Sequence, residues 1–404
     1  HYQRQVHDFI TRDPLAAART RVTLALTPAR APRSGIAPPR VLHVVHGWPP
    51  WAHGGTELYA RWLAQAQARL RDTYVYARLA DPDRVHGDVV EHLDHGVRVR
   101  LVANNFVERN PLVRTGLHSP VLARDFASYV AAVRPDVVHV HHLAGHCASL
   151  LGVARRAGLP VVYQAQDWWP ICARVNLLHA HGHLCAGPSP LACARCVPLT
   201  RLGPAPLASA ALYQARRLWI RRQLRHVDVV LAGSAFIARS YAEHRVLSAR
   251  VPMRVVPYGI DIEPDTEPPA RAGQARLSFG VVGALMAHKG VALCLDAFKR
   301  LPVGVADLHI WGSSDDASYV RRVSALADGR PDVHLHGAFA EADKASVLRS
   351  LDVLIVPSIG LESFGLVARE AMALGVPVMA SRRGALVELF ADGEGGTFFE
   401  PDDT

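Results

Sequence analysis

Two glutamates, Glu362 and Glu370, lie in the stretch of this sequence whose pattern most clearly indicates chemistry. Residues 353–356 are apolar and β-branched, which predicts a buried strand. A turn rich in proline, serine and glycine follows, and helical spacing of apolar residues begins near Gly365. Backbone N–H groups at such a helix start bind anions well. A phosphate held there, with carboxylates accepting hydrogen bonds from sugar hydroxyls, would suit a nucleotide sugar. The alternative is an ordinary strand–loop–helix unit with solvated glutamates.

The same stretch resembles the E-x7-E motif of the retaining family 4 glycosyltransferases. These have an α/β fold called GT-B, in which two Rossmann-like domains face each other across a cleft. The resemblance implies that Glu362 contacts the donor sugar and that Glu370 holds the ribose hydroxyls. It also implies that the turn and the helix start contact the sugar and the diphosphate through Ser363, Phe364, Gly365, Leu366 and Val367.

Length and charge set broad limits on the kind of protein. The chain has 404 residues, enough for two α/β domains. Its net charge of +9 favours an anionic partner, such as a nucleotide diphosphate or an anionic lipid. We expect no nucleic-acid partner. No apolar run reaches the ~18 residues of a membrane-spanning helix. The start resembles no secretory signal and lacks Met, so we expect an upstream start and a cytoplasmic protein.

The alternation of strand and helix patterns predicts a doubly wound fold with two domains. We expect an extension or linker over residues 1–39, with Val6, Phe9 and Ile10 on one face of a short helix. The first domain then covers residues 40–256, a hinge covers 257–276, and the second domain covers 277–404 with its C-terminal end incomplete.

Candidate acceptor residues follow three strand patterns of the first domain. Gly54, Gly55 and Glu57 resemble the family's G-G-x-E motif, which lies at the cleft floor near the donor diphosphate and the acceptor. His141 matches the second histidine of the family's D-V-V-H-x-H segment, near acceptor and donor. Asp167 matches the aspartate of a His-Asp pair whose histidine is replaced here by Gln166. A satisfied core histidine and a turn-capping aspartate are the structural alternatives.

The second domain offers a cation for the diphosphate. Lys289 stands at a glycine-containing strand–helix turn, where a lysine is a good phosphate ligand. With Gly283 and Gly290 it resembles the family pattern G-R-L-x-x-x-K-G, although Ala284 occupies the arginine position. Gly337 lies in a segment that resembles the one whose backbone receives the base.

Four cysteines fall in one loop, residues 168–200, which is long for a segment without regular structure. Four thiolates around a tetrahedral zinc would stabilise it, and the predicted ligands are Cys172, Cys185, Cys193 and Cys196. Nearby histidines are possible substitutes. Unligated thiols, a single disulfide and an oxygen-labile cluster remain open. Four protein thiolates leave no coordination position for substrate, so a catalytic metal is not expected.

A basic segment, residues 212–226, mixes arginines with leucine, tryptophan and isoleucine. A basic amphipathic helix is typical of binding to a membrane surface, which would place the protein peripherally on the inner face of the membrane. A solvated helix face with snorkelling arginines is the alternative.

Together these features predict a retaining glycosyltransferase of the hexosyltransferase type that uses a UDP- or GDP-sugar. Its acceptor would be a cell-surface glycan, a lipid-linked sugar or a small molecule. The resemblance gives catalytic roles to Glu362, Lys289 and His141, and it implies no cofactor for catalysis. The alternatives are a nucleotide-sugar epimerase of the same fold and a non-catalytic nucleotide-sugar-binding module. A Rossmann dehydrogenase is disfavoured, because no G-x-G-x-x-G with a ribose-binding acid follows the first strand.

Overall fold

The computed structural model describes residues 38–105, 117–179, 182–197, 206–262, 276–391 and 394–401. The chain divides into two units, the first containing residues 1–175 and 187–259 and the second residues 176–186 and 260–404. The division after Gly259 falls inside the expected hinge. Residues 176–186 belong to the second unit, whereas the whole cysteine loop was expected in the first domain. The helix expected near Val6 lies outside the described residues.

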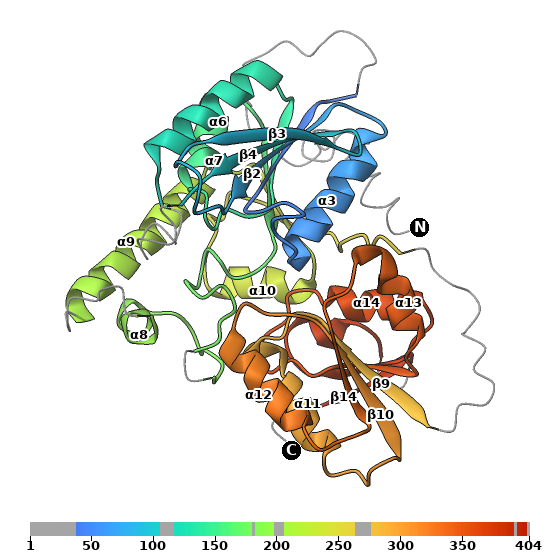
Figure 1. Cartoon of the computed structure of the whole chain (residues 1–404). Coiled ribbons are helices and arrows are strands. Elements are labelled where there is room, and N and C mark those ends of the chain that lie inside the picture. The colour runs from blue at the N-terminus through green and yellow to red at the C-terminus, as the bar shows by residue number, and fades with distance from the viewer. Residues whose placement is uncertain are drawn as a thin grey trace. The chain divides into compact units, whose positions relative to one another are not determined.

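The first unit is built on a sheet of eight strands in the order β3-β4-β2-β1-β5-β6-β7-β8 (Figure 1). All neighbouring strands are parallel except β3 and β4. The strands are β1 (Val41–Val45), β2 (Thr73–Leu79), β3 (Val89–Asp94), β4 (Val97–Ala103), β5 (Val137–Val140), β6 (Val161–Ala165), β7 (Val229–Ala232) and β8 (Met253–Val255). The helices are α3 (Gly55–Ala68), α6 (Pro120–Val133), α7 (Ser149–Arg156), α8 (Pro190–Cys196), α9 (Pro206–Leu224) and α10 (Ala235–Glu243).

Helices cover both faces of this sheet, which follows from the alternation of side chains along β2. Val75 and Ala77 of β2 pack with Ala60 and Ala64 of α3 in one buried cluster. Tyr76, which points to the opposite face, meets Phe126 of α6 edge to face. The strands are therefore buried on both sides, as their continuous apolar runs predict.

The second unit has a sheet of six parallel strands in the order β11-β10-β9-β12-β13-β14. The strands are β9 (Leu277–Val282), β10 (Ala306–Trp311), β11 (Val333–Gly337), β12 (Val353–Val356), β13 (Val378–Ser381) and β14 (Gly396–Phe399). The helices are α11 (Val291–Phe298), α12 (Ala317–Ala327), α13 (Lys344–Arg349) and α14 (Leu366–Ala373), with short 3-10 turns η1 (Ala287–Lys289), η2 (Glu341–Asp343) and η3 (Ala385–Glu388). One apolar cluster joins the sheet to α11 and α12, and another joins it to α13 and α14.

Each sheet reverses its winding direction at one pair of neighbouring strands. In the first unit the reversal lies between β1 and β5, and in the second between β9 and β12. Chain segments that leave the carboxyl ends of such a pair diverge, and ligands of open α/β sheets bind in the crevice between them. The two reversals therefore mark where a site in each unit is expected. None of the helices in the described ranges is both long and apolar enough to cross a bilayer.

Candidate functional site

The β9/β12 reversal of the second unit brings Lys289 and Glu362 together. The Nζ atom of Lys289 donates to Oε1 of Glu362 at 2.7 Å, and Ser358 Oγ donates to the same oxygen at 2.6 Å. Glu362 is largely buried, with 13% of its side chain exposed, whereas Lys289 keeps 35%. The sequence named both residues as donor ligands, and the structure places them in direct contact.

Backbone packing fixes this contact. The amides of Ile359 and Gly360 both donate to the carbonyl oxygen of His288 at 3.0 Å, which ties the turn after β12 to η1. Gly290 has a left-handed backbone with φ of 72°. A Cβ atom there would lie 1.8 Å from the carbonyl oxygen of Pro357, so only glycine allows the two turns to approach this closely.

Glu362 is held in its charged form. Burial alone would raise the pKa of its carboxyl, but the adjacent Lys289 ammonium and the Ser358 hydroxyl outweigh burial and keep the pKa below its ordinary value. A carboxylate and an ammonium therefore face each other here at neutral pH.

The start of α14 provides amide donors beside this pair. The helix begins after Gly365, which has φ of 76° and gives no side-chain cap to the first turn. The amides of Leu366 and Val367 consequently lie at an uncapped helix start, the environment that the sequence predicted for an anion. Ser363 and Gly365 lie in the turn before it. The Phe364 side chain is buried, and the Arg369 guanidinium lies 4.3 Å from the centre of its ring.

Glu370 has a different environment from the one expected. Its side chain is buried and accepts a hydrogen bond from Lys344 Nζ at 3.0 Å, while Lys344 also pairs with Glu341. Burial raises the pKa of Glu370 against the opposing effect of Lys344. The Glu370 carboxylate is hydrogen-bonded to Lys344 of α13. Its predicted role therefore requires it to accept hydrogen bonds from the ribose hydroxyls and from this lysine at the same time.

The two remaining predicted donor glycines lie at strand ends. Gly283, directly after β9, has φ of 148° and donates its amide to the carbonyl of Trp311 at 3.0 Å. Gly337 ends β11 with φ of 75°, and its carbonyl accepts from the Gly312 amide at 2.7 Å. Both belong to the carboxyl-end edge of the sheet, the edge that also carries Lys289.

Two histidine–carboxylate pairs, His46–Glu57 and His142–Asp167, lie next to each other at the β1/β5 reversal of the first unit. His46 lies 3.1 Å from Glu57 through Nε2 and Oε1, and His142 Nε2 donates to Asp167 Oδ2 at 2.9 Å. The rings of His46 and His142 are 4.2 Å apart between centres. Burial lowers the pKa of His46 despite the opposing effect of Glu57. Glu57 and Asp167 were predicted, but the histidines that connect them were not.

Hydrogen bonds define the tautomer of His142 and the charge of Asp167. The amide of Ala144 donates to His142 Nδ1 at 3.1 Å, so the ring proton is on Nε2 and points at Asp167. The Trp169 amide donates to the other Asp167 oxygen at 2.7 Å. Burial would raise the pKa of Asp167, but His142 and this amide hold it below its usual value. Asp167 thus presents a charged carboxylate at the end of β6.

The glycines of the loop after β1 make room for Glu57. A Cβ atom at Gly54 would lie 2.5 Å from Oε2 of Glu57, and one at Gly47 would lie 3.2 Å from Oε1. Gly55 is the first residue of α3. Packing of the buried Glu57 carboxylate is thus one reason why glycine occupies position 54. This structural reason stands beside the predicted role of Gly54 toward a donor diphosphate.

His141 does not join the His142–Asp167 pair. Its side chain is completely buried, and its Nε2 lies 2.9 Å from Nδ1 of His43. Consecutive residues of an extended chain point to opposite faces, so His141 turns inward and His142 turns toward Asp167. His142 is therefore the histidine that meets Asp167, and the predicted role of His141 toward donor and acceptor stays a prediction.

The inward histidines form the one group of potential metal ligands found among the described residues: His43, His139 and His141. All three are buried, and burial lowers the pKa of His43 to about 4 and that of His139 to about 3. Neutral imidazoles are suitable donors. However, His43 and His141 are hydrogen-bonded to each other, and their burial leaves no entry path.

The cysteine loop was expected to lack regular structure, but Cys193 and Cys196 lie in helix α8, which begins at Pro190 with a cap from Ser189. Among the described residues, the predicted zinc ligands do not form a group within ligand distance. Cys185 belongs to the second unit, and Cys172, Cys193 and Cys196 to the first. These three thiols do not all lie within 4.8 Å of one another, since the described residues contain no such cysteine group. Zinc binding by this loop stays a prediction.

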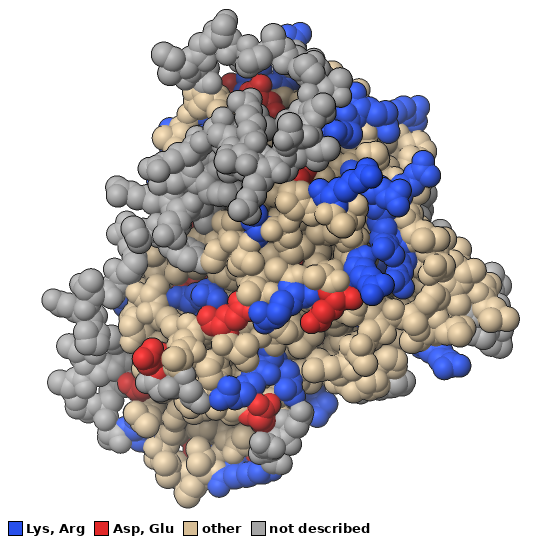
Figure 2. Space-filling view, turned by 180° about the vertical axis from the view of Figure 1, so that it is seen from behind, with Lys and Arg blue, Asp and Glu red and all other residues tan. Residues whose placement is uncertain are grey.

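The basic segment forms the second half of α9, and its apolar side chains are largely used in packing. Ile220 and Leu224 are buried, and Trp219 donates its Nε1 to the carbonyl of Leu117 at 2.7 Å. Leu218 stays exposed among arginines. Figure 2 shows Lys and Arg side chains gathered on one flank of the first unit with few acidic side chains between them. Any membrane contact would therefore be mainly electrostatic rather than an inserted apolar face.

Comparison with known proteins gives matches along most of the chain. A family model described as Glycosyltransferase Family 4 matches residues 53–264, and one described as Glycosyl transferases group 1 matches residues 269–404. A phosphatidyl-myo-inositol mannosyltransferase of Mycobacterium leprae is 33% identical over 35% of this chain and 38% of its own length. This chain thus matches well under half the length of that relative. A D-inositol 3-phosphate glycosyltransferase of Arthrobacter sp. (strain FB24) is 26% identical over 85% of this chain and 77% of its own length.

Solved structures with the same fold extend the comparison. Sucrose-phosphate synthase from Thermosynechococcus elongatus superposes with a TM-score of 0.60 at 20% identity, over 90% of this chain and 86% of that one. HepE from Anabaena in complex with UDP-glucose gives a TM-score of 0.61 at 17% identity over the same shares. At these identities the likeness shows the fold, and it confirms the predicted GT-B class with two parallel-sheet Rossmann-like domains.

Proposed function

Because this chain belongs to Glycosyltransferase Family 4, we propose that it moves a sugar from a nucleotide-diphosphate sugar to an acceptor hydroxyl. The observation that carries the proposal is the Lys289–Glu362 contact at the β9/β12 reversal, beside the uncapped start of α14. A cation, a carboxylate and amide donors there suit the diphosphate and the sugar of one bound donor.

The proposed chemistry follows from charge. As the glycosidic bond breaks, negative charge develops on the diphosphate and positive charge on the sugar. Lys289 and the first amides of α14 would stabilise the diphosphate, and preorganised donors of this kind contribute about 3 kcal/mol each. Glu362, held as a carboxylate, would face the sugar. Without donor, Lys289 and Glu362 neutralise each other, so the bound diphosphate would compete for the ammonium.

We propose retention at the anomeric carbon and no metal cofactor for catalysis. Both come from the family resemblance. In a same-face mechanism the leaving phosphate deprotonates the acceptor, so a separate base is not needed. Proton NMR of the product would show the anomeric configuration, and activity unchanged in EDTA would support a metal-independent reaction.

The first unit would hold the acceptor, with Asp167 and Glu57 as hydroxyl ligands. HepE from Anabaena was solved in complex with UDP and with UDP-glucose, which supports a UDP-sugar as the first donor to test. A GDP-sugar is the second. The names of two relatives contain inositol with a phosphate, free or in a lipid. This supports a phosphate-bearing polyol as the acceptor.

The test compares Glu362→Ala and Lys289→Ala with the wild type in a transfer assay, after a thermal-shift screen has identified the donor. Each substitution is expected to lower turnover at least tenfold, about 1.4 kcal/mol in activation free energy. Lys299→Ala, which removes an exposed lysine of the same unit, is the matched control and is expected to be normal.

Near-normal turnover in both site variants would refute the assignment. Mass spectrometry of the reaction separates the alternatives. An isomerised donor formed without acceptor would indicate an epimerase, and donor binding without turnover would indicate a binding module.

A further inference from the structure

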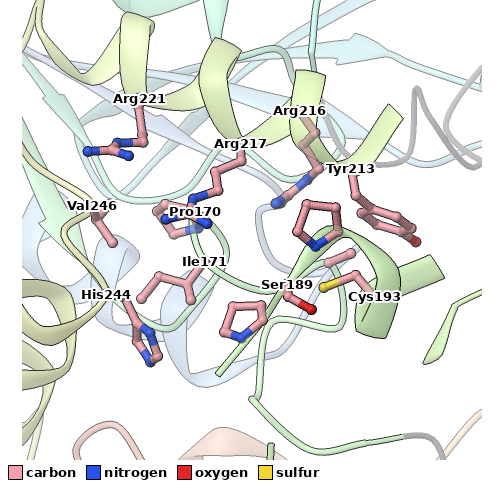
Figure 3. Close-up of a pocket in the computed structure, with 13 residues that line it drawn as sticks. Pro170, Ile171, Ser189, Cys193, Tyr213, Arg216, Arg217, Arg221, His244 and Val246 are labelled. Carbon is pink, nitrogen blue, oxygen red and sulfur yellow. The ribbon is translucent and has the colours of Figure 1, made fainter. Parts of the chain in front are cut away.

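A pocket lies in the first unit beside the chain segment that follows Asp167. Its wall consists of residues 170–173, residues 188–193, one face of α9 and residues 244–246 (Figure 3). Residue 170 is three positions beyond Asp167, and the intervening Trp169 bonds to Asp167 through its amide. The pocket therefore begins where the predicted acceptor segment ends.

The full charges on the described wall of this pocket are three guanidinium groups. Arg217 and Arg221 lie one helical turn apart on α9, and Arg216 is the neighbour of Arg217 (Figure 3). His244 lies across from them, and burial lowers its pKa, so it is mostly neutral at pH 7. No aspartate or glutamate is among the described residues that line the pocket. Within the described ranges, no carboxylate forms an ion pair with any of the three guanidinium groups.

Arg216 is the most informative of these residues, because it is buried and pairs with no carboxylate of the described residues. Only 4% of it is exposed. Its Nη2 donates to the carbonyl oxygen of Trp169 at 2.5 Å, whereas its buried Nε has no hydrogen-bond partner in the part of the chain that the structure describes. Figure 3 shows its side chain extending from α9 toward the pocket.

The described surroundings of Arg216 contain no carboxylate that pairs with its guanidinium. The ionisable groups that act on its guanidinium are Cys172, Tyr213, Cys193 and Tyr163. None of these groups is a carboxylate, and burial raises the pKa of both tyrosines, so the two phenols are neutral at pH 7. An isolated buried cation is strongly unfavourable, and natural proteins pair such groups with an anion.

We propose that this pocket binds a phosphate group. A guanidinium offers a planar fork of N–H donors that matches phosphate oxygens. Three guanidinium groups exceed what a single carboxylate would neutralise, whereas a phosphate monoester brings up to two charges and several acceptor oxygens. Arg216 would bind from the pocket wall, and the exposed Arg217 and half-exposed Arg221 from its rim. The phosphate belongs either to a small soluble ester or to a lipid headgroup.

The first experiment titrates inorganic phosphate by calorimetry at constant ionic strength. All proteins carry Lys289→Ala, which removes the lysine expected to bind phosphate in the second unit. The test variant is Arg217→Gln/Arg221→Gln. Its matched control is Arg222→Gln/Arg225→Gln, which removes equal charge just beside the pocket on residues that do not line it.

The expected result is phosphate binding in the parent, at least tenfold weaker binding in the test variant, and a less than twofold change in the control. Equal weakening in both variants would overturn the proposal in favour of general attraction to a basic surface. Unchanged binding in both would overturn it as well.

A second measurement addresses Arg216 directly. Phosphate is expected to raise the thermal unfolding temperature of the parent, since a ligand of the folded state stabilises it. Arg216→Gln removes the unpaired buried charge, so it is expected to fold and to gain nothing from phosphate. An equal gain in both proteins would contradict a role for Arg216.

Vesicle flotation then distinguishes the two sources of phosphate, using phosphatidylglycerol in phosphatidylcholine. Binding that is lost in the test variant and kept in the control assigns the pocket to a lipid headgroup. Phosphate binding without flotation assigns it to a soluble ester. A parent protein that binds neither phosphate nor vesicles refutes the proposal. No sugar donor is used, so failure here leaves the transferase proposal unaffected.

Discussion

Lowering the pH from 7 to 5.5 is expected to destabilise the first unit, because several of its histidines are buried in the neutral form. Burial lowers the pKa of His43 to about 4 and those of His139 and His146 to about 3. In the unfolded chain each titrates near 6.5. Between these values the unfolded state binds protons that the folded state cannot, so stability falls as pH falls below 6.5.

The magnitude follows from these values. At pH 5.5 an unfolded histidine is mostly protonated and a folded one with a pKa of 3 to 4 is not. Relative to pH 7, each such histidine costs about 1.2 kcal/mol of unfolding free energy. Three together cost about 4 kcal/mol, a large part of the ~5–15 kcal/mol that stabilises an ordinary domain.

His146 is the best residue for the test. Its Nε2 donates to the carbonyl oxygen of Val45 at 2.7 Å, and its buried Nδ1 has no partner. Gln in its place can keep the donor to Val45 while removing the group that titrates. His53→Gln, at an exposed histidine, is the matched control.

The assay is urea unfolding at pH 7 and 5.5, with amide hydrogen exchange of β1 and β5 peptides to assign the transition to the first unit. Whatever His146→Gln costs at pH 7, it should lose about 1.2 kcal/mol less than the wild type on acidification. His53→Gln should follow the wild type. A wild type equally stable at both pH values, or a parallel loss in His146→Gln, would refute the reasoning.

Three further predictions concern other sites. The difference in unfolding free energy between the wild type and Glu362→Gln should be constant above pH 4.5 and shrink below it. The reason is that the folded protein keeps the pKa of Glu362 below its unfolded value. Hydrogen exchange of β12 peptides measures this free-energy difference. Gly290→Ala should lower the unfolding free energy by about 2 kcal/mol or more, through positive φ plus a backbone clash. Gly329→Ala, with the same φ sign but open space, should cost about half as much in the same urea titration. Cys193→Ser should lower the zinc content of purified protein, and freshly reduced wild type without zinc would contradict that prediction.

Local patterns predicted the elements around the second-unit site well. The apolar run at residues 353–356 is β12, and the helix expected near Gly365 is α14. The reason is that side-chain periodicity and glycine turns act over a few residues of chain. Lys289 and Glu362 could be named as candidates because both stand in glycine-containing strand–helix turns and match motifs of the family.

Partners from distant parts of the chain could not be predicted in the same way. Glu370 has the spacing of a ligand, yet a lysine of α13 meets it in the interior. His141 and His142 are equivalent in chemistry, and only the choice of buried face separates them. The burial of Arg216 against the Trp169 carbonyl is likewise a property of its surroundings, because the sequence of α9 alone predicts an ordinary basic helix.

The sequence by itself determined most of the strands and helices around the second-unit site, although it missed α8 inside the cysteine loop. It also indicated which turns carry candidate groups for a nucleotide sugar. Only the tertiary structure decided that β9 lies beside β12 and β1 beside β5, which brings those turns together. The physical reason is that strand order arises from hydrogen bonds and packing between segments far apart in the chain. The periodicity of side chains within one segment does not indicate which other strand that segment pairs with.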